Sequence, residues 1–444
     1  MKPFFHAEDC GISLVCRCET GRGHHENHAV GVTHHSQTLE RKPARAPAPA
    51  AVALAGLTAV AIAMGIGRFA LTPILPMMQQ DFGLSVSDGG WLASANYLGF
   101  LFGAVSAISV RVRSTTALRV GLVVIAIVTL GMGLTTEFAI WIILRALAGI
   151  ANAWAQVFAF AWCLEKLAAV QRPLLNGVVF AGVGIGITLA GGFCLLLMAV
   201  NGSSAEAWIG LALISLIATT AIWRILGADD DATAGEDRRP TAHPWQWNVD
   251  SLRLVLCFGA SGFGYIIPAT FLPAMARQFI PDPLVFGWSW PIFGAAAAVA
   301  PLATAGWAQV LGNRYLWILS HLVMAFGVAI PVRWPTISGI MIAALLVGAT
   351  FMINAMASME EAQSIAGPHS TRLMAAMIAG FGTGQMVGPI LVSYVIGPGV
   401  NFSKPLLIAS LVLIASVYAL SHEPAAKQTR SPERNLRSKN ESCP

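Results

Sequence analysis

Long apolar segments alternate with short polar connections along most of this chain. A helix needs about 20 mostly apolar residues to cross a bilayer, and about twelve segments have that length and character. The first six lie near residues 53–78, 89–110, 118–135, 139–163, 174–200 and 206–226. The second six lie near 252–275, 286–309, 315–332, 336–358, 373–397 and 404–421. The pattern predicts an all-α membrane protein with about twelve transmembrane helices.

The longest polar connection, Gly227 to Asp250, divides these segments into two sets of six. We therefore predict two six-helix bundles, at 51–226 and 251–421, joined by a cytoplasmic linker at 227–250. Residues 1–50 are predicted to be a disordered cytoplasmic extension, and residues 422–444 a cytoplasmic tail. The extension contains six of the ten histidines as well as Cys10, Cys16 and Cys18. A metal-binding tail is an alternative, but the spacing matches no zinc pattern, and we expect no metal site.

Composition supports the membrane class. The chain is 56% hydrophobic and 11% charged, whereas soluble domains carry about 25% charged residues. The net charge of +5 is dispersed among loops, so we expect no nucleic-acid partner. Under the arrangement with the N-terminus inside, the outer connections hold only Arg277, Arg333 and Lys404 among basic residues. Lys and Arg concentrate in cytoplasmic loops, and this asymmetry predicts that both termini are cytoplasmic.

The two sets of six segments carry related sequences. A shift of 197 residues places Gly67-Arg68 over Gly264-Tyr265, Pro76 over Pro273, Phe82 over Phe279 and Gly90-Trp91 over Gly287-Trp288. A shift of 202 places Asn152 over Asn354, Gly182 over Gly384 and Gly186 over Gly388. These matches indicate a duplicated six-helix unit with both copies in parallel orientation.

Several motifs resemble those of the major facilitator superfamily. The stretch LRALAG places Arg145 and Gly149 as in the RxxxG element of that superfamily, and GVGIGITLAG resembles its glycine-rich element with Ile187 in place of proline. The stretches GIGRFALTPILPMMQ, GWLASANYLGFLFGA and GPHSTRLMAAMIAGFGTGQMVGP resemble the YbfB/YjiJ-type bacterial branch. The loop RVRSTT lacks the aspartate of the superfamily's second-loop element. The resemblance implies a multi-pass transporter of the bacterial cytoplasmic (inner) membrane, with helices one, four, seven and ten around a central cavity.

Polar residues at helical spacing follow one face of each of those four helices. They are Arg68 and Thr72; Arg145, Asn152 and Gln156; Ser261 and Tyr265; and Thr350, Asn354 and Glu361. A charge inside an apolar segment is expensive and usually functional. Arg68 and Arg145 are predicted to lie at similar depth, with no Asp or Glu at that level. Because a guanidinium binds carboxylate bidentately, we predict a substrate site at Arg68, Thr72, Arg145, Asn152, Gln156, Tyr265 and Asn354.

Other interpretations stay open for several of these residues. Arg145 would equally serve to pin helix four to helix two through backbone carbonyls, and Asn152 and Asn354 would serve as hydrogen-bonded links between helices. Glu361 and His321 are candidates for gating or proton transfer, although a solvated helix end and an interior histidine explain them as well. Helix bending or packing is expected at Pro73, Pro76, Pro273, Gly182, Gly186, Gly388 and Pro389.

These observations predict a secondary active transporter of a small anionic organic solute, working by alternating access. The alternatives are a proton-coupled drug or metabolite efflux pump and a membrane sensor that transports nothing. A membrane enzyme is disfavoured, because the segments bring no nucleophile, base and metal ligands together. No GxxxxGK[ST] element is present, so ATP drive and a cofactor are not expected. The expected partners are a small-molecule substrate, the lipid bilayer and protons as coupling ion, and we expect a monomer.

Overall fold

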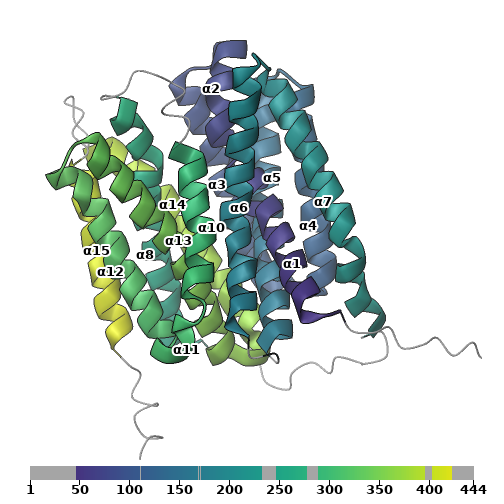
Figure 1. Cartoon of the computed structure of the whole chain (residues 1–444), viewed down its shortest axis with the longest axis vertical. Helices are drawn as coiled ribbons and strands as arrows, with labels where there is room; N and C mark the ends of the chain where they lie inside the picture. The colour runs from purple at the N-terminus through teal and green to yellow at the C-terminus, as the bar shows by residue number, and fades with distance from the viewer. Residues whose placement is uncertain are drawn as a thin grey trace, which may run out of the picture. The chain divides into compact units, whose positions relative to one another are not determined.

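The computed structural model describes residues 47–110, 112–168, 170, 172–232, 247–277, 289–395 and 403–422, which form helices and connections with no strand among them. The first set of helices is α1 (Pro49–Val60), η1 (Ala61–Arg68), α2 (Leu71–Phe82), α3 (Val86–Ser109), α4 (Ser114–Leu134), α5 (Phe138–Ala168), α6 (Pro173–Ala199) and α7 (Ser204–Ala232). The second set is α8 (Val249–Arg277), α10 (Ser289–Thr304), α11 (Trp307–Leu311), α12 (Asn313–Arg333), α13 (Ile337–Ala366), η2 (Gly367–His369), α14 (Ser370–Val395) and α15 (Ser403–Ser421). Figure 1 shows the long helices running alongside one another. The predicted all-α membrane fold is confirmed.

The described residues contain ten helical stretches that are long and apolar enough to cross a membrane. One of them, Ile337–Gly388, contains two helices, α13 and most of α14, with the short turn η2 between them. A shorter apolar helix covers Trp290–Thr304. The number twelve stays a prediction. Several helices are longer than the apolar segments that predicted them, because regular hydrogen bonding continues past the apolar residues into polar ends, as in α5 and α13.

Local sequence signals set where helices begin and end. Pro49 and Pro173 occupy the first turns of α1 and α6, where a missing N–H is tolerated. Ser85 caps α3 in a reciprocal capping box with Asp88. Gly83 ends α2 with a φ of 67°, a left-handed conformation that glycine adopts without strain. These signals place the connections, while the apolar faces decide how the helices pack.

The same helix pairs form in both sets. α1 packs against α5, α6 and α7, and α8 packs against α13, α14 and α15 in the same order. α4 packs against α5 and α7, just as α12 packs against α13 and α15. Such repeated pairing is what a duplicated six-helix unit would produce. The boundaries of the two bundles stay a prediction, and residues 44–444 cluster as one compact unit.

Glycine seams hold the corresponding pairs together. A Cβ on Gly182 would lie 2.2 Å from the carbonyl oxygen of Leu57, and one on Gly186 would lie 2.4 Å from that of Ala61. In the second set, a Cβ on Gly384 would lie 2.1 Å from the carbonyl oxygen of Gly259. Small residues at these positions let helix backbones approach closely. The matching glycines Gly182 and Gly384 therefore both let two helix backbones approach closely, whereas Gly388, the counterpart of Gly186, faces the side chain of Ile266.

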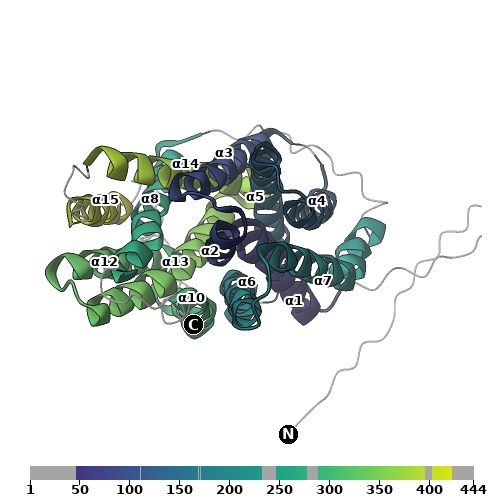
Figure 2. The same ribbon diagram turned by 90° about the horizontal axis from the view of Figure 1, so that it is seen from above.

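Two long seams join the first set to the second. α6 packs along α10, and α3 packs along α14, as Figure 2 shows from above. On the first seam, a Cβ on Gly184 would lie 2.2 Å from the backbone nitrogen of Ala298. On the second, a Cβ on Gly382 would lie 3.0 Å from the Phe100 ring. The candidate site lies next to the second seam.

Some predicted features lie outside the described residues. These are most of the extension at 1–50, residues 233–246 of the linker, the tail after residue 422, and the repeat positions Phe279, Gly287 and Trp288. Pro273 lies within α8 and Pro389 within α14, but the side chains of both are outside the described part of the structure. Pro76 is inside α2, which continues through it.

Candidate functional site

The first membrane segment changes its winding as it reaches Arg68. Residues Ala61–Arg68 form a π-helix, and the Phe69 N–H donates to the carbonyl oxygen of Met64 at 3.0 Å, five residues back. Glycines at 65 and 67 leave room for the neighbours: a Cβ on Gly65 would lie 2.4 Å from Gly186. π-helical turns are rare and are frequent at functional sites. The wider turn places the Arg68 side chain between helices of the two sets.

Arg68 is 3% exposed and is surrounded by aromatic rings. Its guanidinium carbon lies 4.1 Å from the ring centre of Phe100 and 5.0 Å from that of Tyr97, both on α3. A cation over an aromatic face is stabilised by the ring quadrupole. Its Nη2 donates to the side-chain oxygen of Gln385 on α14, which belongs to the second set. Nε and Nη1 have no hydrogen-bond partner, so two donors of a buried cation are left for another acceptor.

Arg145 lies at the same level but is used differently. Its Nη1 donates to the Gly67 carbonyl at 3.2 Å, and its Nη2 donates to the Arg68 carbonyl at 3.1 Å. The side chain is 3% exposed. These bonds attach α5 to the end of η1, so the acceptors belong to the first membrane segment and not to the second. The geometry favours the pinning role over direct substrate binding.

Asn96 and Gln385, neither of which was predicted as a site residue, complete this arrangement. Asn96 on α3 donates to the carbonyls of Gly67, at 3.4 Å, and Arg145, at 3.1 Å. Gln385 is fully buried and connects α14 to Arg68. A signal for Gln385 existed, because the shift of 202 residues sets this polar side chain over Val183. It breaks the internal symmetry in the second half, as Arg68 does in the first.

Tyr265, the repeat counterpart of Arg68, lies beside it in space. The tyrosine on α8 is fully buried, lies within electrostatic range of Arg68, and neighbours Gln385. Its hydroxyl and the Gln385 side-chain nitrogen lack a hydrogen-bond partner of normal geometry. Buried polar atoms are normally satisfied. Arg68, Tyr265 and Gln385 therefore form a group from three helices, in which Tyr265 and Gln385 interact with each other and Arg68 keeps two unused hydrogen-bond donors.

The other predicted substrate residues lie in three different surroundings. Asn152 and Gln156 are buried on α5, where both polar atoms of Asn152 and the oxygen of Gln156 have no partner. Asn354 on α13 instead accepts from the Ser320 hydroxyl and contacts the Met324 sulfur at 3.8 Å, so it links α13 to α12. Thr72 is exposed. Asn152 and Gln156 thus stay candidates for ligand contact, whereas the geometry of Asn354 favours a structural link.

His321 is enclosed within the second set of helices. It is fully buried on α12, with Nε2 2.5 Å from the Ser261 hydroxyl of α8 and Nδ1 3.4 Å from the Ser416 hydroxyl of α15. Ser261 was predicted to share a face with Tyr265. The contact therefore joins the histidine to a helix that carries a site residue, and its role in proton transfer stays a prediction.

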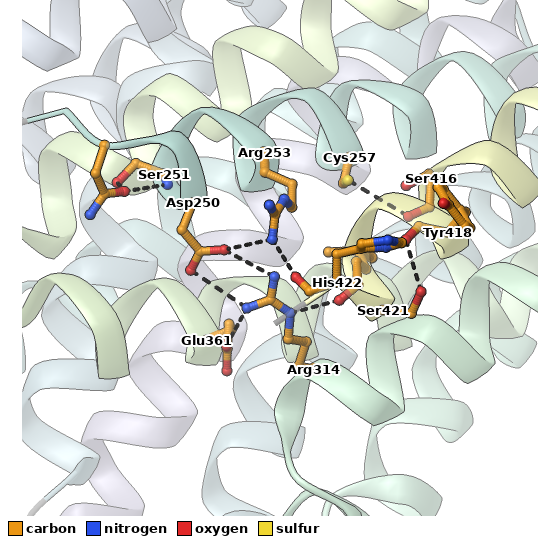
Figure 3. Close-up of polar contacts among 12 residues, drawn as sticks. Asp250, Ser251, Arg253, Cys257, Arg314, Glu361, Ser416, Tyr418, Ser421 and His422 are labelled. Carbon is orange, nitrogen blue, oxygen red and sulfur yellow. Dashed lines mark hydrogen bonds and ion pairs between the residues drawn. The ribbon is translucent and has the colours of Figure 1, made fainter. Parts of the chain in front are cut away.

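Glu361 belongs to a cluster of charges at one end of the second set, where Arg314 lies between Asp250 and Glu361 (Figure 3). Arg314 lies 3.0 Å from Asp250 and 4.0 Å from Glu361, and its Nε donates to the Leu420 carbonyl at 2.9 Å. Arg253 also pairs with Asp250, at 3.4 Å. The cluster ties α8, α12, α13 and α15 together. On the neighbouring residue Glu360, a carboxylate oxygen accepts from Asn176 of α6 at 2.8 Å, which connects the two sets of helices at this end.

Comparison with known proteins identifies the family. A family model described as "Uncharacterised MFS-type transporter YbfB" matches residues 60–420, most of the chain. The chain belongs to this MFS-type transporter family. A stretch of 128 residues, 28% of the chain, is 29% identical to the "Uncharacterized MFS-type transporter YceJ" of Bacillus subtilis (strain 168) and covers 32% of that relative. The resemblance found in the motifs is confirmed, and the protein is a multi-pass membrane protein of a transporter family.

Proposed function

We propose that this member of the MFS-type family is a secondary active transporter of a small anionic organic solute. The observation that carries the proposal is Arg68, a buried guanidinium with two unpartnered nitrogens and no Asp or Glu bonded to it within the described residues. Leaving a charge buried and incompletely paired is costly. A ligand carboxylate offers the bidentate acceptor that the arginine lacks.

The position of Arg68 supports a role in alternating access. It lies on the first set of helices, while Gln385 and Tyr265 lie on the second, so a ligand at Arg68 touches both halves. A carboxylate that binds Arg68 bidentately needs Nη2 together with either Nε or Nη1, so it competes with Gln385 for Nη2. Ligand binding would then change a contact between the halves, and a ligand shifts a conformational equilibrium only through such differential contacts. Rocking of the halves would carry the site from one side of the membrane to the other.

The proposal also covers the location of the protein, its orientation in the membrane and its energy source. We place the protein in the bacterial inner membrane with both termini in the cytoplasm, on the basis of its Lys and Arg distribution. Symport or antiport with protons would supply the energy, with His321 and Glu361 as candidates for the proton step.

Flux measurements test the proposal directly. Purified full-length protein in liposomes is assayed for uptake and efflux of a panel of carboxylates, with and without a pH gradient. Arg68→Ala should abolish flux, and Arg68→Lys should leave a small remainder, because an ammonium lacks the planar fork. Arg333→Ala, which removes an exposed arginine at the end of α12, is the matched control and should keep wild-type flux.

Three outcomes would contradict the proposal. Unchanged flux in Arg68→Ala would remove the arginine from the mechanism. Transport restricted to neutral or cationic drugs would favour the efflux pump. Absence of flux for every solute, from a protein that still binds a ligand, would favour a sensor.

A further inference from the structure

A group of six buried or largely buried aromatic side chains lies beside the candidate site. This aromatic wall consists of Phe69, Tyr265, Trp290, Phe293, Phe351 and Phe381. Tyr265 stacks on Phe351 with ring centres 4.3 Å apart and an interplanar angle of 12°. The remaining neighbours are 5.4–6.4 Å apart, so the rings form one continuous group. These separations are typical of attractive aromatic pairs.

The wall adjoins Arg68 and spans both sets of helices. Phe69 follows Arg68 in the chain, its ring centre lies 5.8 Å from the guanidinium carbon, and it contacts Trp290 and Phe351 of the second set. Tyr265 lies within electrostatic range of Arg68. The cation therefore has the wall on one side and the rings of α3 nearby. A ligand at Arg68 would meet aromatic surface as soon as it extends beyond its charged group.

The unpartnered polar atoms in this region are mostly donors. The donors are Nε and Nη1 of Arg68, Nε of Arg145 and Nε1 of Trp290, and the one acceptor beside them is Asn96 Oδ1. The Tyr265 hydroxyl and the Gln385 side chain interact with each other. Arg145, the neighbouring cation, already donates to two backbone carbonyls. Arg145 keeps its charge but has two of its nitrogens bonded to backbone carbonyls, so the guanidinium offered to a ligand is that of Arg68, which suits one carboxylate. The donors favour a ligand with its acceptors gathered at one end.

We propose that the substrate is an aromatic monocarboxylate. This inference rests on the proposed function and specifies its substrate class. The carboxylate binds Arg68 in place of the Gln385 oxygen, and the ring lies against the aromatic wall beside Tyr265 and Phe351. Sugar acids and other hydroxylated acids are disfavoured, because hydroxyl groups buried against phenyl faces lose water without gaining a hydrogen-bond partner. Saturated rings fit less well, because they lack the stacking attraction of an aromatic ring.

Binding to the full-length protein in nanodiscs tests the inference by isothermal titration calorimetry at pH 7.5. The reference probe is phenylacetate. Cyclohexylacetate replaces its aromatic ring with a saturated ring, gluconate is a hydroxylated acid without a ring, and benzyl alcohol keeps the aromatic ring but has no charge. Phenylacetate should bind about three- to tenfold more tightly than cyclohexylacetate, the range that one aromatic pair contributes. Gluconate and benzyl alcohol should show no binding at the same concentrations.

Variants locate the ring. Phe351→Leu should weaken phenylacetate binding about three- to tenfold and leave cyclohexylacetate binding unchanged. Phe180→Leu is the matched control, because Phe180 stacks on Phe160 at 4.4 Å between α5 and α6 and does not belong to the wall. It should change neither affinity. Arg68→Met should abolish the binding of both acids.

The outcomes separate this inference from the proposed function. If either gluconate or cyclohexylacetate binds as tightly as phenylacetate, the aromatic substrate class is wrong. If that binding still requires Arg68, the proposed anion site stands. If no acid binds, or Arg68→Met binds normally, both ideas fail. The ranking of the four probes is read from the wild-type protein, so the test of the aromatic class does not depend on the folding of any variant; only the assignment of the anion site to Arg68 uses Arg68→Met.

Discussion

Replacing Arg145 with methionine distinguishes its two interpretations. Arg145→Met keeps an unbranched side chain of similar length and removes the donors to the carbonyls of Gly67, at 3.2 Å, and Arg68, at 3.1 Å. Hydrogen bonds between helices in membrane proteins contribute about 0.6 kcal/mol on average and up to about 1.7. Two such bonds from a charged donor give an expected loss of about 1–3 kcal/mol in the free energy of unfolding. Asn96 still donates to Gly67, so the Arg68 carbonyl is the group left unsatisfied.

The assay is thermal unfolding in detergent, followed by circular dichroism and tryptophan fluorescence. Arg145→Met should unfold several degrees below the wild type. Arg68→Met is the comparison, because it removes a buried cation with two unpartnered nitrogens. It should unfold at or above the wild-type temperature, since residues kept for function often lower stability. Wild-type thermal stability in Arg145→Met, together with loss of ligand binding, would refute the pinning role and return Arg145 to the substrate site.

Three further perturbations test the packing. Gly149→Ala should lower expression and thermal stability, because its Cβ would lie 2.1 Å from a carbonyl oxygen of α3, whereas Gly90→Ala, with no atom within 4 Å, should be tolerated. Asn176→Asp should speed hydrogen exchange at the end of α13, because it sets a second carboxylate beside Glu360; unchanged exchange would deny this contact a role. Asp250→Asn should lower the free energy of unfolding by about 1–3 kcal/mol in denaturant titrations, because it weakens the ion pairs with Arg253 and Arg314. A change below about 0.3 kcal/mol would show that this cluster contributes nothing measurable to stability.

The central residue of the site was predictable from local sequence, but its partners were not. Arg68 stands out because a charge interrupts an apolar segment, and that signal needs no knowledge of neighbours. Gln385 and Asn96 give a weaker signal, because a neutral amide in an apolar helix is often a simple hydrogen-bonded link. Their contacts cross 317 and 29 positions of the chain, respectively, so helix periodicity cannot pair them with Arg68 or Gly67.

Helix faces were predicted better than contacts. The spacing of Arg145, Asn152 and Gln156 placed all three on one face of α5, and all three are buried. Spacing did not show that Arg145 bonds to backbone carbonyls while Asn152 has no partner. It also did not predict that the first segment is π-helical before Arg68, since π-helical turns are rare.

The sequence by itself determined the membrane class, the family, the duplicated pattern of helices and the single arginine of the first segment. These follow from hydrophobicity, spacing and motifs, which are properties of one stretch of chain at a time. Only the tertiary structure decided which of the two arginines bonds to backbone carbonyls, because that depends on which carbonyls and amides neighbouring helices bring within about 3 Å. It also gathered six aromatic residues beside Arg68. Their rings come from five separate parts of the chain, with Trp290 and Phe293 together on α10, and only the packing of the helices brings them together.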